Sequence, residues 1–252
     1  MKRTIAGIFF MLNVTGISIC CSQSKISGGD SITIHKNFEK KQNLRKATKL
    51  PFYLISAGLL SYIDSDIIGR EEIAEERNES IPDFHTSTDD YLQYAPIALA
   101  YGLDLFGVEA RHDLKTRTKL LIKSELLMML AVVPLKQITH QLRPDGSNYS
   151  SFPSGHTAQA FVAATFMHKE YGHLSPWYSI GAYTIASSVG ILRVLNNRHF
   201  SSDVLVGAGL GILATNFVYL SHKVKNKKKY HLIMSPIYND RNIGLAVTMR
   251  FN

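Results

Sequence analysis

The sequence predicts an all-α protein: an antiparallel helical bundle with several apolar helices that could span a membrane, plus a small C-terminal β-hairpin. Small residues such as Ala182, Gly190 and Gly207 lie within the apolar segments and favour close packing of helices. The tail differs, because apolar and polar residues alternate there with a period of two. The expected helices comprise Leu50–Ile63, Tyr94–Val108, Leu120–Leu135, Thr157–Met167, Tyr178–Leu195 and Val204–Leu220.

Composition leaves the environment of this bundle open. Hydrophobic residues make up 45% of the 252 residues and the mean hydropathy is −0.02. These values are ordinary for a soluble protein and low for one that crosses a membrane many times. The net charge of +8 suits an anionic partner, such as a phosphorylated substrate or an anionic lipid. No nucleic-acid-binding motif is recognisable, so no nucleic-acid partner is expected. The oligomeric state is not predicted.

Residues 1–21 predict a signal peptide or an N-terminal anchor. A short basic region precedes the apolar run Ile5–Ile19, which is too short to cross a bilayer comfortably, so a secretory signal is favoured. Cys20 or Cys21 is an alternative site of lipidation, although the residues before them fit a lipoprotein cleavage site poorly. Residues 22–49 are polar and basic and are interpreted as a linker.

Residues 50–229 are expected to form one helical domain. Its acidic stretch, residues 71–90, is interpreted as a solvated helix and loop, since no histidine–carboxylate spacing there predicts a metal site. No metal or other cofactor is expected. Residues 230–252 are interpreted as a β-hairpin appendage, with turn-forming residues at 239–242.

The basic residues that follow the last helix predict its orientation. Lysines within 223–229 indicate a cytoplasmic end if that helix spans a membrane, so Asp203 at its other end would face outward. With the helices alternating in direction, only one of Leu50–Ile63 and Tyr94–Val108 can span. The more interrupted Tyr94–Val108 is expected to lie on the surface.

The first of three polar blocks contains two cations close to a proline. Lys136 and Arg143 are seven residues apart, which places them on one face if a single helix carries both. Pro144 is expected to end that helix and leave both cations at its mouth. Arg143 can bind two phosphate oxygens in a fork, while Lys136 supplies a compact charge.

The second block, Pro153 to His156, predicts the start of a helix. Ser154 suits an N-cap, and Gly155 lets a ligand approach the backbone closely. Free N–H groups at a helix start attract an anion. His156 would then lie on the first turn, facing the bound group.

The third block supplies a nucleophile. His199 precedes Asp203 by four residues, one helical turn if the region is helical, so the carboxylate can fix the imidazole tautomer for attack on phosphorus. Arg193 completes the anion clamp. We expect a phosphohistidine at His199, with His156 first protonating the leaving oxygen and then assisting water.

These blocks resemble the type 2 phosphatidic acid phosphatase superfamily, which includes lipid phosphatases, bacterial acid phosphatases and vanadium haloperoxidases. The resemblance covers residues 136–203 in the patterns Lys-x6-Arg-Pro, Pro-Ser-Gly-His and Arg-x5-His-x3-Asp, with Leu192 in place of the usual serine. It implies an antiparallel helical bundle with the site at one end. The implied site residues are Lys136, Arg143, Ser154, Gly155, His156, Arg193, His199 and Asp203.

The resemblance implies a phosphatase acting on an envelope lipid. Residues 143–152 look like the bacterial branch that acts on lipid A or related lipids. Undecaprenyl pyrophosphate and phosphatidic-acid-like lipids stay open as substrates, and so do a soluble nonspecific acid phosphatase and a vanadium haloperoxidase. A membrane scaffold that retains the motif is the non-enzymatic alternative. For the lipid phosphatase, we expect a cell-envelope membrane protein whose active site faces the periplasm.

Overall fold

A computed structural model of the chain describes residues 11–13, 16–18, 29–64, 69–222, 230–239 and 242–251. The chain divides into two compact units, one formed by Phe38–His222 and the other by Met1–Asn37 together with Lys223–Asn252. Each unit is described by itself.

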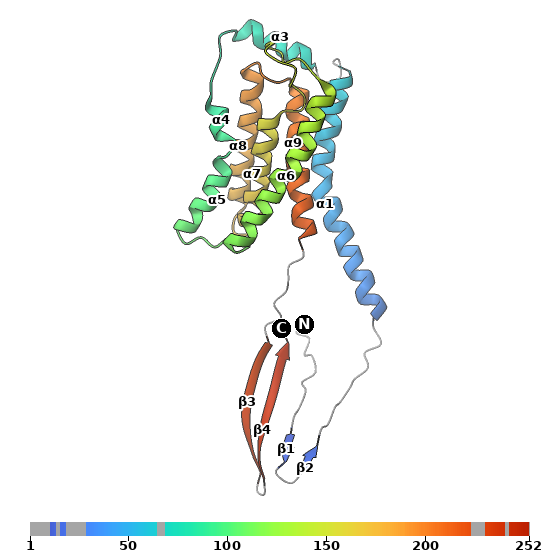
Figure 1. Ribbon diagram of the computed structural model, residues 1–252, viewed down its shortest axis with the longest axis vertical. Coiled ribbons are helices and arrows are strands. Elements are labelled where there is room, and N and C mark those ends of the chain that lie inside the picture. The colour runs from blue at the N-terminus through green and yellow to red at the C-terminus, as the bar shows by residue number, and fades with distance from the viewer. Residues whose placement is uncertain are drawn as a thin grey trace. The chain divides into compact units, whose positions relative to one another are not determined.

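The described part of the larger unit is helical, which confirms the predicted all-α class. Its long helices lie alongside one another, and α3 crosses one end of the bundle (Figure 1). The helices are α1 (Gly29–Ile63), α3 (Arg70–Ser80), α4 (Thr88–Leu92), α5 (Ala95–Leu105), α6 (Leu114–Thr139), α7 (Gly155–Tyr171), α8 (Pro176–Leu195) and α9 (Ser201–Ser221).

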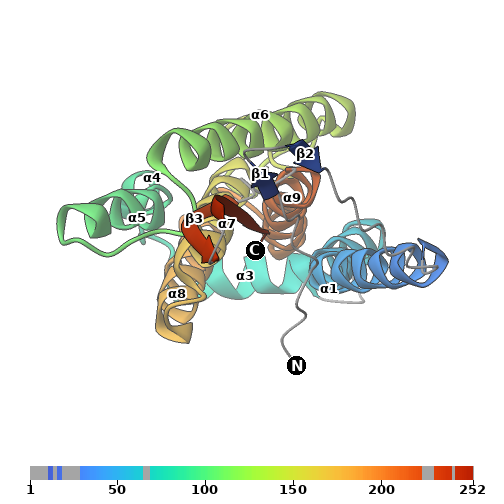
Figure 2. The same cartoon turned by 90° about the horizontal axis from the view of Figure 1, so that it is seen from below.

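Helix α7 lies at the centre of the bundle. Viewed along the bundle, α7 and α9 lie between α6, α8 and α1 (Figure 2). Small residues let α9 approach α7 closely: a β-carbon at Gly207 would lie only 2.5 Å from the carbonyl oxygen of Ser154, and Gly211 faces the carbonyl of Ala158 in the same way. On another face of α9, Gly209 meets Ile55 of α1. This packing brings the beginnings of α7 and α9 together.

The ends of two helices shape the region before α7. Helix α6 ends at Thr139, because His140 adopts a left-handed backbone with φ 44° and its N–H donates to the carbonyl of Lys136 at 3.2 Å. The Thr139 hydroxyl donates to the carbonyl of Phe152 at 3.1 Å, which ties the end of α6 to the segment leading into α7. Helix α9 begins at Ser201, and the Asp203 carboxylate accepts a hydrogen bond from the backbone N–H of Phe200 at 3.1 Å.

A buried carboxylate lies near the C-terminal end of α7 and binds residues of two other segments. Glu170 accepts hydrogen bonds from the backbone N–H of His112 at 3.0 Å and from the hydroxyl of Tyr219 at 2.6 Å. Its second contact with His112, through Nδ1, measures 2.9 Å. Burying a carboxylate is costly without such partners, so this cluster fastens α7 to α9 and to the loop before α6.

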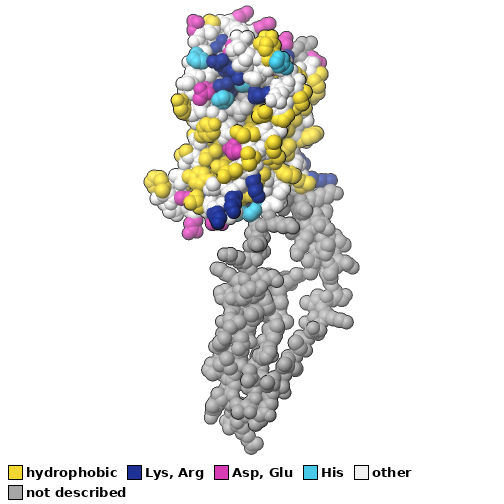
Figure 3. All heavy atoms as spheres, viewed as in Figure 1, with side chains coloured by type: hydrophobic (Ala, Val, Ile, Leu, Met, Phe, Trp, Pro, Cys, Tyr) yellow, Lys and Arg dark blue, Asp and Glu magenta, His cyan; other side chains and the backbone are white. Residues whose placement is uncertain are grey.

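Two of the described helices, α8 and α9, are long and apolar enough to cross a membrane by length and composition. Hydrophobic side chains gather along the middle of the helical unit, while basic side chains lie towards its ends (Figure 3). Large apolar side chains are exposed on several helices, among them Leu59, Leu99, Leu126, Leu130, Ile180, Ile191 and Phe217. An exposed apolar surface of this extent is typical of a membrane or protein interface.

The smaller unit contains two antiparallel strand pairs in its described residues. Strand β3 (Tyr230–Asn239) pairs with β4 (Asn242–Phe251), with Asn239 opposite Asn242 at the turn. This is the segment interpreted from the sequence as a hairpin. Strands β1 (Met11–Asn13) and β2 (Gly16–Ser18) pair within the apolar N-terminal run. Most of the predicted targeting segment lies outside the described residues, and its role stays a prediction.

One predicted boundary differs from the structure. Residues 29–49, interpreted as part of an irregular polar linker, form the first half of α1. The interpretation rested on polar composition, which does not exclude a helix.

Candidate active site

The three polar blocks meet at one end of the helical bundle. The N–H of Ser154, just before α7, donates to the carbonyl of Asp203 at 3.0 Å. A β-carbon at Gly155 would lie 3.8 Å from the Cε atom of Lys136, so this lysine crosses the start of α7. Residues from α6, α7 and α9 that are far apart in the sequence therefore converge on one candidate anion-binding site, as the motif order predicts.

His199 and Asp203 form a buried pair, although not on one helical turn as the sequence suggested. His199 precedes α9, whereas Asp203 belongs to its first turn. The imidazole Nδ1 lies 3.4 Å from Asp203 Oδ2, and the two side chains are 1% and 0% exposed. This distance is long for a hydrogen bond, and Nδ1 has no hydrogen-bond partner within the described residues, so the carboxylate and the ring nitrogen face each other in a longer polar contact.

The Asp203 carboxylate is itself firmly held. Its Oδ2 atom accepts hydrogen bonds from the Ser151 hydroxyl at 2.5 Å and from the N–H of Phe200 at 3.1 Å. The Ser202 hydroxyl donates to Oδ1 at 3.2 Å. These partners fix the orientation of the carboxylate, which faces His199 in a set direction.

Burial lowers the pKa of His199 to about 4, and the contact with Asp203 only partly opposes this effect. The imidazole is therefore neutral at physiological pH. With Nδ1 facing Asp203, Nε2 is the nitrogen left to act as a nucleophile.

Lys136 lies in the last turn of α6 and points across the segment that precedes α7. Its Nζ atom donates to the carbonyl of Ser150 at 2.5 Å and contacts the carbonyl of Ser151 at 3.4 Å. Burial, and secondarily the charge of Arg143, lowers the pKa of Lys136 to about 8. Its ammonium group remains mostly charged at neutral pH and is held by backbone oxygens.

Arg143 does not lie on the same helix as Lys136, which corrects the prediction from their spacing. Helix α6 stops at Thr139, and Arg143 belongs to the following loop, where its N–H donates to the carbonyl of Asn148 at 3.0 Å. Burial and the neighbouring charge of Arg193 lower the pKa of Arg143. The two cations nevertheless share the pocket, because the loop folds back over the helix end.

The second block forms the predicted helix start. Ser154 is the N-cap of α7, but its hydroxyl contacts Thr157 Oγ1 at 2.9 Å instead of capping a backbone N–H. Its own N–H is already engaged with Asp203, so the unused N–H groups at this end begin with Gly155. His156 lies on the first turn, as predicted, and is 33% exposed.

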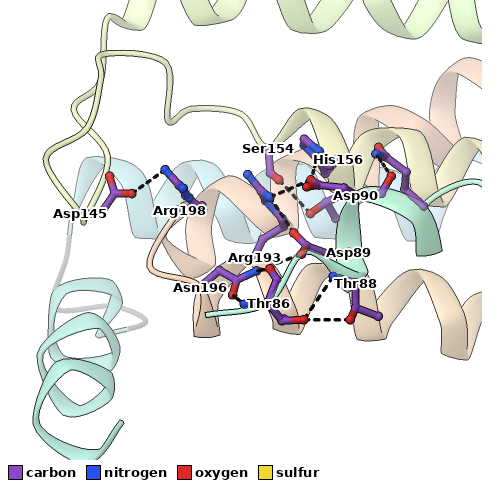
Figure 4. Close-up of polar contacts among 12 residues, drawn as sticks. Thr86, Thr88, Asp89, Asp90, Asp145, Ser154, His156, Arg193, Asn196 and Arg198 are labelled. Atoms are coloured by element: carbon purple, nitrogen blue, oxygen red, sulfur yellow. Dashed lines mark hydrogen bonds and ion pairs between the residues drawn. The ribbon is translucent and has the colours of Figure 1, made fainter. Parts of the chain in front are cut away.

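Arg193, in the last turn of α8, is bound to a carboxylate that sequence reasoning missed. Its Nη1 atom donates to Asp89 Oδ2 at 2.6 Å, and the side chain of Asn196 donates to the other oxygen of Asp89 at 2.9 Å (Figure 4). Asp89 is buried, which corrects the interpretation of residues 71–90 as wholly solvated. No local signal in the sequence pairs this aspartate with an arginine so far along the chain.

A second carboxylate, Asp90, faces His156. Asp90 Oδ1 lies 2.9 Å from His156 Nε2 and 3.7 Å from Arg193 Nη1 (Figure 4). Burial and the charge of Arg193 lower the pKa of His156, while Asp90 and Asp89 act in the opposite direction. Helix α4 therefore supplies two adjacent acids to a pocket whose other charged groups come from α6 to α9.

Two buried guanidinium N–H donors of the site lack a partner among the described residues. The Nε atoms of Arg143 and Arg193 are buried and have no hydrogen-bond partner within the part of the chain that the structure describes. Buried polar groups without partners are rare, and a phosphate would supply acceptor oxygens for both.

The part of the chain that contains this site is similar to known proteins. Residues 118–227 match the PAP2 superfamily. The chain is 39% identical over 203 residues to the lipid A 1-phosphatase of Porphyromonas gingivalis, a match that covers 79% of this chain and 43% of that protein. The chain thus spans less than half the length of this curated relative.

Two solved structures are similar. The crystal structure of Aquifex aeolicus LpxE has 26% identity and a TM-score of 0.44, with 57% of this chain and 93% of that chain covered. A transmembrane PAP2 type phosphatidylglycerolphosphate phosphatase from Bacillus subtilis has 23% identity and a TM-score of 0.51, with 69% and 94% covered. The latter likeness indicates a shared fold. All three motif blocks lie within the matched segment, so the predicted resemblance to the PAP2 superfamily is confirmed for residues 118–227.

Proposed function

We propose that this chain is a phosphatase that hydrolyses a phosphate monoester or pyrophosphate of an envelope lipid through a phosphohistidine at His199. The observation that carries the proposal is the buried His199–Asp203 pair, 3.4 Å apart, in a pocket of fixed cations. A neutral imidazole directed by a carboxylate can attack phosphorus, and the cations can bind the oxygens over which the transition state spreads its charge. The cations are Lys136, Arg143 and Arg193.

The reaction is proposed to proceed in two displacements. In the first, His199 Nε2 forms a bond to phosphorus as the bond to the ester or anhydride oxygen breaks, and His156 gives that oxygen a proton. In the second, water attacks the phosphohistidine, His156 accepts a proton from the water, and the bond between nitrogen and phosphorus breaks. Inorganic phosphate leaves, and both histidines return to their starting states.

The membrane setting is proposed from the helices and from the lysines of the tail. Helices α8 and α9 can each cross a membrane by length and composition, and Asp203 lies in the first turn of α9. The lysines within residues 223–229 follow the other end of α9 and favour the cytoplasm. We therefore place the pocket on the periplasmic side, within reach of lipid headgroups.

Among envelope lipids, the phosphate of lipid A is the first candidate substrate. The lipid A 1-phosphatase of Porphyromonas gingivalis shares 39% identity with this chain over 203 residues. A hydrophobic midsection next to a group of basic side chains near one end of the helical unit fits a substrate whose phosphate is attached to a membrane-anchored lipid (Figure 3).

A panel of substrates tests this proposal. Detergent-purified full-length protein is assayed for phosphate release from lipid A phosphate, undecaprenyl pyrophosphate, phosphatidylglycerol phosphate, phosphatidic acid and a soluble aryl phosphate. We expect the highest kcat/KM with lipid A phosphate and loss of turnover in His199→Ala that remains folded by circular dichroism. A preference for the aryl phosphate, with active protein extracted without detergent, would favour a soluble acid phosphatase. Peroxide-dependent halide oxidation with vanadate would favour a haloperoxidase.

A further inference from the structure

We propose that Asp90 is a positioning residue for His156: it holds one ring nitrogen of the histidine so that the other nitrogen delivers the proton to the leaving group. This inference rests on the proposed function. It assigns a role to a residue that precedes the segment matched to the PAP2 superfamily, which begins at residue 118.

The geometry distinguishes Asp90 from its neighbour. Asp89 is buried and directed at Arg193, with an Oδ2 to Nη1 distance of 2.6 Å. Asp90 is 52% exposed and lies closer to His156 Nε2, at 2.9 Å, than to Arg193 Nη1, at 3.7 Å. Adjacent acids on α4 thus have different partners: one fixes the arginine of the clamp and the other contacts the histidine.

Side-chain contacts with the end of α8 hold the segment that carries Asp90. Thr86 and Asn196 exchange two hydrogen bonds, of 2.9 Å to Asn196 Oδ1 and 2.8 Å from Asn196 Nδ2. Arg77 donates to the carbonyls of Leu195 at 2.8 Å and Phe84 at 2.9 Å. These contacts anchor the segment that precedes α4. The position of the Asp90 carboxylate at His156 therefore depends on these hydrogen bonds as well as on the attraction between the two side chains.

The contact between Asp90 and His156 resembles the contact between Asp203 and the proposed nucleophile His199. Asp203 faces one nitrogen of His199 and leaves the other for phosphorus. In the same way, an imidazole with Asp90 at Nε2 presents Nδ1 as its second exchangeable site. The pocket then contains two histidine–carboxylate pairs, one for the attacking atom and one for the departing oxygen.

The charges around His156 explain why it needs a carboxylate. A general acid must carry a proton, yet burial and the charge of Arg193 from α8 lower the pKa of His156. Asp90 and Asp89 from α4 oppose that effect. Lys136 from α6, Arg143 from the loop that follows it and Asp203 from α9 are further charged groups of the site. Removing Asp90 therefore favours the neutral imidazole, which cannot donate the required proton.

The test compares two leaving groups across pH in full-length protein. An alkyl phosphate needs its leaving oxygen protonated, whereas nitrophenolate departs readily without a proton. In Asp90→Asn, we expect kcat for the alkyl phosphate to fall about tenfold near neutral pH, with the alkaline limb of its pH profile about one unit lower. The kcat for nitrophenyl phosphate should change by less than about twofold.

Matched variants show that the effect acts through His156. Asp83→Asn removes the same charge from an exposed position before α4 and should leave both profiles unchanged. Asp90→Glu should restore part of the alkyl phosphate activity. In a His156→Gln background, Asp90→Asn should cause no further loss, because the group through which it acts is gone.

Other outcomes contradict the assignment. Suppose that Asp90→Asn lowers KM and tightens inhibition by inorganic phosphate with kcat unchanged for both substrates. Asp90 would then be a competitor for the phosphate position, and the positioning role would be wrong. Identical pH profiles for the wild type and Asp90→Asn would also overturn it. Absence of wild-type turnover on every phosphate ester would instead contradict the proposed function.

Discussion

Arg193 Nη1 and Asp89 Oδ2 lie 2.6 Å apart, although the two residues are separated by 104 positions in the chain. Both side chains are buried, and Asn196 binds the second oxygen of the aspartate at 2.9 Å. The pair uses one of the five N–H donors of the guanidinium and fixes the direction of the others. Arg193 is thus already oriented for an anion before any substrate binds.

Removing Asp89 should damage both stability and turnover. Asp89→Ala removes the nearest carboxylate from a buried guanidinium, and breaking a buried ion pair in this way typically costs about 3–5 kcal/mol. Asp89→Asn keeps the shape but not the charge, so we expect a smaller drop in thermal stability and a fall in kcat/KM of about 10²-fold. Melting temperature and phosphate release in detergent measure the two effects. The exposed Asp83→Asn serves as the control, and an Asp89→Asn protein with wild-type kcat/KM would contradict this role.

Replacing the carboxylate behind the nucleophile should stop chemistry without unfolding the bundle. In Asp203→Asn, the amide oxygen can still accept the hydrogen bonds of Ser151 and Phe200, but the neutral amide no longer stabilises the positive charge that develops on the imidazole. Loss of one such electrostatic partner typically lowers kcat about 10²–10³-fold, and we expect a loss of that order. Single-turnover phosphate release measures the chemical step directly. A loss confined to KM would show that Asp203 serves binding alone.

Acid should inactivate and destabilise the protein through His199. Burial lowers the pKa of this histidine to about 4, while an exposed histidine in the unfolded chain titrates near 6.5. The unfolded state therefore binds the proton first, so the stability linked to neutral His199 is fully present above about pH 6.5 and is lost as pH falls towards 4. Over the same interval, kcat/KM should persist until the pH approaches about 4, where the nucleophile itself becomes protonated.

The pH dependence of melting in His199→Gln tests this assignment. Glutamine has a similar volume and no titratable group, so its melting temperature should fall less between pH 6.5 and 4 than that of the wild type. Parallel curves for the two proteins would assign the acid sensitivity to other groups. The carboxylates of the pocket are present in both proteins, so their contributions cancel in the comparison.

Residues whose roles follow from local spacing could be predicted from the sequence. Ser154 and His156 lie at a helix start because a small N-cap residue and a glycine precede an apolar run, and that rule acts over a few residues. The order and spacing of the three blocks also predicted that Lys136 and His199 lie in the same site. The separation of Arg143 from the helix of Lys136 was not predicted, because a left-handed backbone at His140 ends α6 early and no glycine marks the place.

Residues whose roles depend on distant contacts could not be predicted. Asp89 and Asp90 stand in an acidic stretch whose other members are mostly exposed, and the same composition is typical of a solvated helix. What makes the two aspartates different is the return of α8 beside α4, which brings Arg193 and Asn196 to them. That contact depends on packing between helices far apart in the sequence. It produces no hydrophobic period and no residue spacing that could be recognised in the sequence.

Because Gly207 of α9 lies against the Ser154 backbone at the start of α7, the turnover rate should depend on the close packing of these two helices. A β-carbon at Gly207 would lie 2.5 Å from the carbonyl oxygen of Ser154, which is backbone and cannot swing aside. Gly207→Ala must therefore push α9 away from the start of α7 and strain the hydrogen bond from the Ser154 N–H to the Asp203 carbonyl. Overpacking of this kind costs about 1–3 kcal/mol, and we expect kcat to fall at least about tenfold.

A second glycine separates this effect from the intrinsic influence of alanine on a helix. Gly181 lies within α8, and a β-carbon added there would have no neighbouring side chain or other helix within 4 Å, so Gly181→Ala meets no obstacle. It should preserve kcat and raise the melting temperature slightly, since alanine favours a helix by about 1 kcal/mol over glycine. If Gly207→Ala behaved like Gly181→Ala, the start of α7 would tolerate displacement from α9. The pocket would then not depend on the close approach of these two helices.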